Sequence, residues 1–247
     1  DRIDTANFEQ KKVAANRPQG DYVSWAVLID RLEKALAAFA PRHPIDRLRQ
    51  QISAECKDAA ERSAGIYTLT VPTGGGKTLA SLRFSLHHAE RRKLDRIIYV
   101  IPFTSIIDQN AKVVRDILEP DEFPQDKGKV VLEHHSSVTP EKQTWREKML
   151  CENWDAPVVY TTMVQLLETL FGSGTRGARR MHQLANAVLI FDEIQTLPIR
   201  CVHLFNNAIN FLSEQCNSTV VLCTATQPLL HKVAVDQGAI RLADGHE

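Results

Sequence analysis

The stretch Val71-Pro72-Thr73-Gly74-Gly75-Gly76-Lys77-Thr78 decides the fold expected for this chain of 247 residues. An apolar, β-branched run at 66–71 precedes the glycines, and a run typical of a helix follows from 79 onward. Strand, glycine-rich turn, Lys-Thr and helix is the layout of a phosphate-binding loop, whose backbone N–H groups face phosphate oxygens. We expect Lys77 to reach the β- and γ-phosphates of ATP and the Thr78 hydroxyl to ligate Mg²⁺.

The first glycine of the general loop pattern is absent, because Val71 stands in its place. This departure disfavours the loop of a small GTPase or a small-molecule kinase. The alternative is a glycine-rich turn between strand and helix that binds nothing. Lys77 and Thr78 argue against that alternative, because they stand where phosphate and metal chemistry needs them.

A second motif lies far downstream, where the apolar run 187–191 is followed at once by Asp192 and Glu193. The unbroken run predicts a strand buried on both faces of a parallel sheet. Ligands bind outside the carboxyl ends of such strands, so both carboxylates should face the phosphate site. We expect Asp192 to bind Mg²⁺ through water, and Glu193 to orient the attacking water and accept its proton. The alternative is a pair of solvated acids that cap a helix.

Strands and helices alternate from residue 65 onward, which predicts an α/β domain with a parallel sheet and helices on both faces. The expected strands span 66–71, 96–101, 130–132, 158–160, 188–191 and 220–223. Residues 1–64 carry no strand signal, and their apolar spacing predicts helices near 25–39 and 45–61. We therefore expect a helical segment at 1–64 and one α/β domain at 65–247.

Composition agrees with an enzyme core that is not embedded in a membrane. Lys and Arg number 30, as do Asp and Glu, so bulk charge argues neither for nor against nucleic acid. No apolar stretch reaches membrane-spanning length, so we expect no membrane partner. The five cysteines are scattered, which predicts reduced residues of a cytoplasmic protein.

Two pairs of adjacent histidines, at 87–88 and 134–135, are poor candidates for metal binding. Adjacent side chains on a helix point apart, so such a pair does not converge on one ion. The sequence contains no His-Asp doublet, so a histidine-aspartate nuclease centre is not encoded in it.

Taken in order, these motifs make residues 65–227 resemble the first motor domain of superfamily 2 helicases, and most of all the helicase-nuclease of type I CRISPR systems. The segments that carry the resemblance are 67–78, 101–110, 160–166, 192–195 and 224–226. The Pro-Phe-Thr-Ser-Ile-Ile run at 102–107 points past helicases in general to this family.

The resemblance implies a RecA-like P-loop domain that uses Mg²⁺ and ATP to translocate 3′ to 5′ on single-stranded DNA. It also implies antiviral defence, with recruitment to an RNA-guided CRISPR surveillance complex that has opened a target duplex. In this family a nuclease domain precedes the motor and a second motor domain follows it. The chain begins without Met, so we expect it to be part of such a longer protein.

Further residue roles rest on the resemblance. The glycines Gly74, Gly75 and Gly76 would bind nucleotide. Gln195, Thr224 and Thr226 would couple the γ-phosphate to movement, and the alternative for the two threonines is that they are ordinary turn residues. In the wider superfamily an upstream glutamine reads adenine, and Gln50 is the candidate, although a solvated helical face is the alternative.

Two strand ends carry the candidate DNA contacts, which are Pro102, Phe103, Thr104, Thr161 and Thr162. Hydroxyls and free amides there can hold phosphates without net positive charge, and the alternative is that the threonines are helix N-caps. For the whole chain, the alternative to a motor is a binding module that keeps the fold without hydrolysing ATP.

Overall fold

A single six-stranded sheet organises the chain, whose computed structural model describes residues 22–135, 153–172, 177, 180–225, 230 and 239–242. All strand pairs are parallel, and the spatial order is β1-β6-β5-β2-β4-β3. The strands are β1 (Ile66–Thr70), β2 (Arg96–Ile101), β3 (Val131–His134), β4 (Val158–Thr162), β5 (Ala187–Phe191) and β6 (Thr219–Thr224). The predicted parallel sheet is therefore confirmed.

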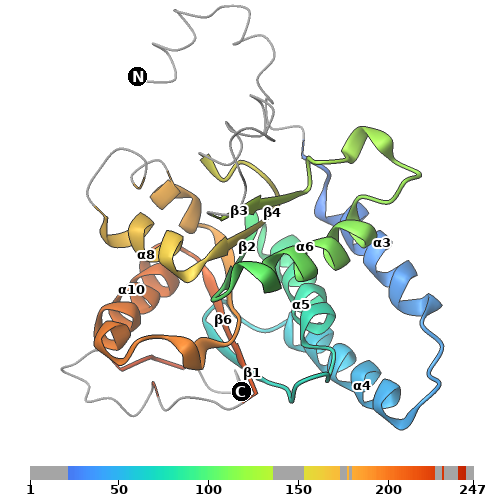
Figure 1. Cartoon of the computed structure of the whole chain (residues 1–247), viewed down its shortest axis with the longest axis horizontal. Coiled ribbons are helices and arrows are strands. Elements are labelled where there is room, and N and C mark those ends of the chain that lie inside the picture. Colours follow the sequence, from blue (N-terminus) through green and yellow to red (C-terminus); the bar gives the residue numbers. More distant parts are fainter. Residues whose placement is uncertain are drawn as a thin grey trace, which may run out of the picture.

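Helices cover both faces of the sheet (Figure 1). On one side lie α5 (Lys77–Arg92) and α6 (Thr104–Leu118), and on the other lie α8 (Met163–Phe171) and α10 (Val202–Gln215). The short 3₁₀ helices are η1 (Pro124–Asp126), η2 (His182–Leu184), η3 (Ile194–Thr196) and η4 (Ile199–Cys201). The two faces correspond to two separate clusters of buried apolar side chains, as expected when alternate residues of each strand point to opposite faces.

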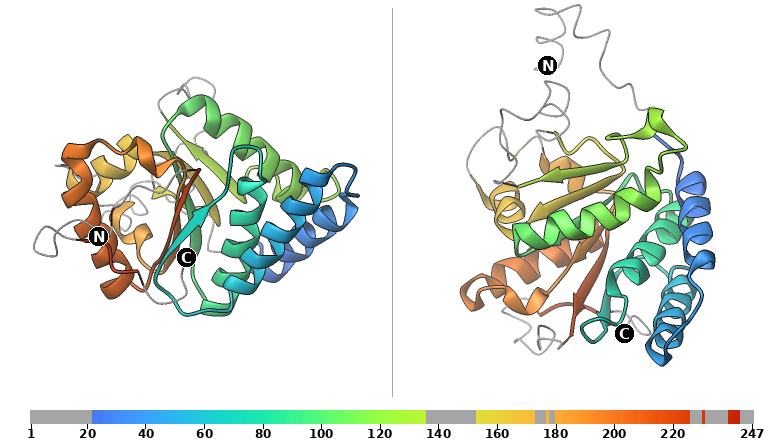
Figure 2. Two further views of the ribbon diagram at one scale, coloured as in Figure 1. Left: turned by 90° about the horizontal axis from the view of Figure 1, so that it is seen from below. Right: turned by 45° about the vertical axis from the view of Figure 1, so that its right-hand side comes forward.

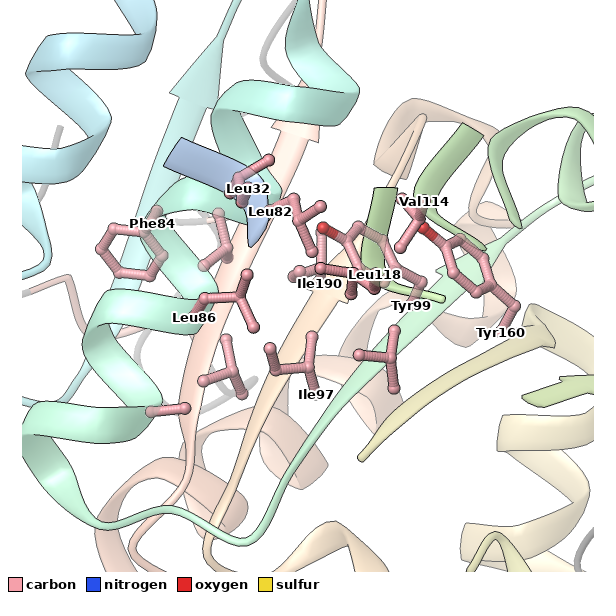
Figure 3. Close-up of a cluster of buried hydrophobic side chains, with 14 of the residues drawn as sticks. Leu32, Leu82, Phe84, Leu86, Ile97, Tyr99, Val114, Leu118, Tyr160 and Ile190 are labelled. Carbon is pink, nitrogen blue, oxygen red and sulfur yellow. The ribbon is translucent and has the colours of Figure 1, made fainter. Parts of the chain in front are cut away.

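Aromatic stacking joins the strands on the α5 side of the sheet (Figure 3). The rings of Tyr99 on β2 and Tyr160 on β4 stack with centroids 4.7 Å apart. The Tyr99 hydroxyl lies 3.3 Å from Ser81 Oγ on α5, so one buried polar group binds the helix to the sheet. This packing fixes α5, and with it the loop that precedes α5.

The predicted N-terminal helices are α3 (Trp25–Ala38) and α4 (Pro44–Ala59), which lie against α5 and α6 (Figure 2). Arg83 of α5 donates to both carboxylate oxygens of Glu33 on α3, at 2.8 and 2.6 Å. Burial alone would raise the pKa of Glu33, but hydrogen bonds from Arg83 and His87 lower this pKa to about 2. The two helices thus pack on the α/β domain, while a domain boundary at residue 64 stays a prediction.

No helix in the described ranges is both long enough and apolar enough to span a bilayer. The four cysteines within those ranges, Cys56, Cys201, Cys216 and Cys223, are all free thiols. Cys151 lies outside the described residues.

One buried carboxylate organises the connection from α6 to β3. Glu119 has a side chain only 1% exposed, and it accepts hydrogen bonds from the backbone N–H groups of Gly128, Val130 and Val131 at 2.8–2.9 Å. Arg31 of α3 donates to the Leu118 carbonyl at 2.5 Å. These polar contacts replace water for backbone groups that the loop buries.

Replacing Glu119 with Gln should therefore lower the free energy of unfolding by about 2–4 kcal/mol, because an amide NH₂ would face backbone donors. Urea unfolding followed by circular dichroism measures this change. The matched control is Glu122→Gln in the same loop, where the side chain is exposed and a change within about 0.5 kcal/mol is expected. Equal stability of both variants would contradict this role for Glu119.

Candidate nucleotide and nucleic-acid site

The glycine-rich loop leads directly into the N-terminus of α5. Gly76 is the N-cap of α5 with φ +83°, a left-handed conformation in which a side chain is strained. At Gly75 an added Cβ would lie 2.6 Å from Val71 Cγ1 and 2.9 Å from the Pro72 carbonyl oxygen. Among the described residues no side chain caps α5, so its first amide groups and its positive dipole end are open to an anion.

Lys77 meets both predicted carboxylates. Its Nζ lies 2.7 Å from Asp192 Oδ1 and also donates a hydrogen bond to Glu193 Oε1. The Asp192 side chain is 13% exposed and that of Glu193 is 30% exposed. The sheet order explains the meeting, because β6 alone separates β1 from β5 and their carboxyl ends share one edge.

Burial and mutual charge set the ionisation of the three groups. Burial raises the pKa of Asp192 above its usual value, although the Lys77 ammonium opposes that rise. Burial would also raise the pKa of Glu193, but hydrogen bonds from Lys77 and Gln195 lower it below its usual value. Burial would lower the pKa of Lys77, yet both carboxylates raise it, so Lys77 stays protonated.

The backbone of Glu193 is left-handed at the point where its carboxylate meets Lys77. Its φ is +52°, a conformation that costs a non-glycine residue about 1–2 kcal/mol. Two hydrogen bonds hold this conformation, since the Thr196 N–H and hydroxyl both donate to the Glu193 carbonyl, at 2.9 and 2.8 Å. The Asp192 backbone N–H donates to the Val100 carbonyl of β2 at 3.0 Å, which fixes the acidic pair to the sheet. Such local strain concentrates at functional sites.

A chain of hydrogen bonds runs from the acidic pair to β6 and back to the phosphate loop. The Gln195 amide donates to Glu193 Oε2 at 2.6 Å, and the Thr224 hydroxyl donates to Gln195 Oε1. The Thr224 carbonyl accepts from the Val71 N–H at 3.1 Å. Two of the three predicted coupling residues, Gln195 and Thr224, therefore link Glu193 to β6. Thr226 lies outside the described residues.

Two residues at the site were not predicted from the sequence. The Thr78 hydroxyl donates to Asn110 Oδ1 of α6 at 3.4 Å. Arg49 of α4 donates from Nε to the Gly74 carbonyl at 2.8 Å. The side chain of Arg49 also packs against Gly76, since a Cβ atom added at Gly76 would lie 3.1 Å from Arg49 Cγ. Gln50 is adjacent on α4, but its amide donates to the Phe39 carbonyl at 3.3 Å. Adenine reading by Gln50 stays a prediction.

The candidate DNA contacts fall into two groups. Phe103 is the N-cap of α6, and its side chain is 56% exposed. No side chain in the described ranges caps that helix. Pro102 and Thr104 beside it are partly exposed. These residues leave the N-terminus of α6 accessible at the same sheet edge as the phosphate loop.

The two threonines that end β4 are bonded within the protein. Thr162 is the N-cap of α8 and accepts from the Gln165 N–H at 3.2 Å, as in the helix-cap alternative. Thr161 is fully buried, and its hydroxyl donates to the His134 carbonyl of β3 at 3.1 Å. Backbone pairing with β2 carries β4 to Thr162, two residues beyond the predicted strand. DNA contact by Thr161 and Thr162 stays a prediction.

A phosphate loop, an acidic pair and a parallel sheet covered on both faces together define a P-loop nucleotide-binding domain. Comparison with known families assigns it further, because residues 47–233 match the DEAD/DEAH box helicase family. The chain belongs to this family of ATP-hydrolysing helicases.

The chain is also similar to the CRISPR-associated nuclease/helicase Cas3 of Haloferax volcanii. The two are 31% identical over 225 residues, which make up 81% of this chain and 23% of that protein. The chain thus spans about a quarter of the length of this relative.

Solved structures share the fold. A crystal structure of T. fusca Cas3 with ADP matches 81% of this chain and 23% of its own, with a TM-score of 0.60 and 17% identity. The DEAD-box helicase Mss116, bound to single-stranded RNA and UDP-BeF, matches 84% of this chain and 42% of its own at a TM-score of 0.53 and 15% identity. The RecA-like fold predicted from the sequence is confirmed.

Arg49 provides a test of the geometry around the loop. Arg49→Ala should weaken ATP binding about tenfold, because the charge-assisted hydrogen bond to the Gly74 carbonyl and the packing beside Gly76 are both lost. Fluorescence anisotropy with a labelled ATP analogue measures the affinity. Arg47→Ala is the matched control, since Arg47 is an exposed cation on the same helix. Equal ATP affinities of the two variants would show that Arg49 does not contribute to nucleotide binding.

Proposed function

We propose that this chain is the first motor domain of an ATP-driven translocase for single-stranded DNA. The observation that carries the proposal is the meeting of Lys77 with Asp192 and Glu193 beside an uncapped helix N-terminus. A decayed binding module would be expected to have lost at least one of these groups. Their joint presence favours a motor over a module that only binds.

The residues fit Mg²⁺ and ATP. Loop amides and the α5 N-terminus suit the phosphates, and Lys77 suits the β- and γ-phosphates. Thr78 and Asp192 supply oxygen atoms, the ligand type that Mg²⁺ prefers, and would hold the ion. Bound Mg²⁺ would neutralise phosphate charge during hydrolysis.

Glu193 is the proposed general base. Its lowered pKa keeps the carboxylate ionised near neutral pH, which is the form that accepts a proton from water. Gln195 and Thr224 would transmit the state of the γ-phosphate position from Glu193 to the end of β6, through the hydrogen bonds that join them.

The proposed DNA surface is the open end of α6. Amides at an uncapped N-terminus hold phosphate oxygens without reading sequence, as a translocating motor requires. Exposed Phe103 offers a ring on which a base can stack. Thr161 and Thr162 would contribute at the start of α8 through backbone groups, since their hydroxyls are already bonded.

The similarity to Cas3 supports a role in CRISPR interference and antiviral defence in the cytoplasm. In this proposal an RNA-guided surveillance complex recruits the full-length protein, and a nuclease domain cuts the strand that the motor moves. A second motor domain would complete the ATP site. An arginine supplied from another domain can be worth about 10³–10⁵ in rate, so this chain alone should hydrolyse ATP slowly or not at all.

The test compares ATP hydrolysis by this chain with that of the chain continued through its second motor domain, each with and without single-stranded DNA. Only the longer form should respond to DNA. In that form Glu193→Gln should retain ATP binding and stop turnover, while Lys77→Ala should lose binding.

Phe103→Ala should reduce the stimulation by DNA and leave DNA-independent hydrolysis unchanged. Val113→Ala is its control, being an exposed apolar residue elsewhere on α6. If the folded longer form hydrolyses no ATP, the binding module becomes the better interpretation. If it hydrolyses ATP but ignores single-stranded DNA, the substrate assignment is wrong.

A further inference from the structure

Three potential metal ligands converge where α6 meets the end of β3. Asp108 lies in the second turn of α6, Glu133 in β3 and His135 directly after β3. One oxygen or nitrogen atom from each side chain lies within 4.8 Å of the other two. None of these residues belongs to the nucleotide site described above.

His135 is the central member of the cluster. The residue is 8% exposed, and neither nitrogen of its ring has a hydrogen-bond partner within the described part of the chain. Its Nε2 instead faces the two carboxylates, at 3.2 Å from Asp108 Oδ1 and 3.8 Å from Glu133 Oε2. A buried imidazole without hydrogen bonds is costly, so this arrangement calls for a ligand.

The spacing suits a shared ion. Ligand atoms at about 2.1 Å from one metal ion stand roughly 3.0–3.5 Å apart in octahedral or tetrahedral geometry. The His135–Asp108 distance of 3.2 Å lies within that interval, and the His135–Glu133 distance of 3.8 Å lies just outside it. Asp108 has a 63% exposed side chain, so an ion can enter from solvent.

An ordinary ion-pair network explains less of the geometry. Arg115 contacts Glu133 Oε1 at 2.5 Å, but the oxygen that faces His135 is Oε2. A neutral imidazole that only paired with Asp108 would be expected to donate a well-formed hydrogen bond, and none forms.

We propose that Asp108, Glu133 and His135 form a binding site for a divalent transition-metal ion, with Zn²⁺ as its best-matched occupant. One imidazole nitrogen and two carboxylate oxygens suit Zn²⁺ better than Mg²⁺, which strongly prefers oxygen ligands and retains its water. Three protein ligands leave a further position for water.

The bound ion would join α6 to β3 near the sheet edge that carries the phosphate loop. Asp108 lies one turn from the N-terminus of α6, so the ion would hold that end of the helix in place. The site is therefore structural, and its loss should be seen in metal content and thermal stability.

The test is Zn²⁺ binding to metal-stripped protein, measured by equilibrium dialysis in excess Mg²⁺ and without nucleotide. Wild-type protein should bind one equivalent of Zn²⁺ that Asp108→Asn and His135→Gln do not bind, or bind at least about tenfold more weakly. Zn²⁺ should also raise Tm in the wild type and not in Asp108→Asn. The control is Asp116→Asn, an exposed acid on the same helix that should retain the equivalent.

Because Asp108 is exposed, its variant should fold even if the His135 variant does not, and circular dichroism checks this. If wild type and Asp108→Asn bind Zn²⁺ with the same stoichiometry and affinity, the cluster is an ion-pair network and the proposal fails. Selective binding of Mn²⁺ instead of Zn²⁺ would overturn the choice of ion.

Discussion

The half-buried ammonium of Lys77, held between the carboxylates of Asp192 and Glu193, is the interaction on which the rest of the site depends. Burial disfavours the charged form of each of these groups, and the opposite charge beside it offsets that cost. The two partners come from segments more than 100 residues apart, so the contact exists only because β1, β6 and β5 lie side by side. The order of strands in the sheet therefore brings the three charged groups together.

The same charges suit two states of the site. Without nucleotide, Lys77 compensates the acids. With nucleotide in the proposed site, phosphates would compensate Lys77 and Mg²⁺ would compensate Asp192. Lys77 and Asp192 would thus each exchange one opposite charge for another, and the Glu193 carboxylate would be released to accept a proton from water. Hydrogen bonds from Glu193 through Gln195 to Thr224 connect these charged groups to β6. The Thr224 carbonyl at the end of β6 also accepts a hydrogen bond from the Val71 N–H at the start of the phosphate loop.

Sequence patterns predicted the strands well because a parallel sheet buries both faces, so each strand is an apolar run of distinctive composition. Lys77, Asp192 and Glu193 were placed together by a general rule about strand ends, and the structure brings them into contact. Arg49 and Asn110 escaped prediction because they reach the loop through packing of α4 and α6, which no local pattern encodes. The helix-cap alternative described Thr162 correctly, since Asx- and Thr-type caps are set by local sequence.

The histidine pair at 134–135 shows another limit of sequence reasoning. Considered as neighbours, the two rings do not converge on one ion. The structure instead places His135 beside Asp108 on a different element, a partner that sequence separation conceals. Long-range pairs of this kind depend on the register between α6 and β3, which only the folded chain defines.

In the proposed nucleotide site, phosphate replaces the acidic pair as the partner of Lys77. A crystal structure of this chain with Mg²⁺ and a non-hydrolysable ATP analogue tests it most directly. We expect Lys77 Nζ within hydrogen-bond distance of the β- or γ-phosphate, and Asp192 turned toward the ion. Nucleotide bound elsewhere, or bound there with Lys77 still on Asp192 and Glu193, would contradict it.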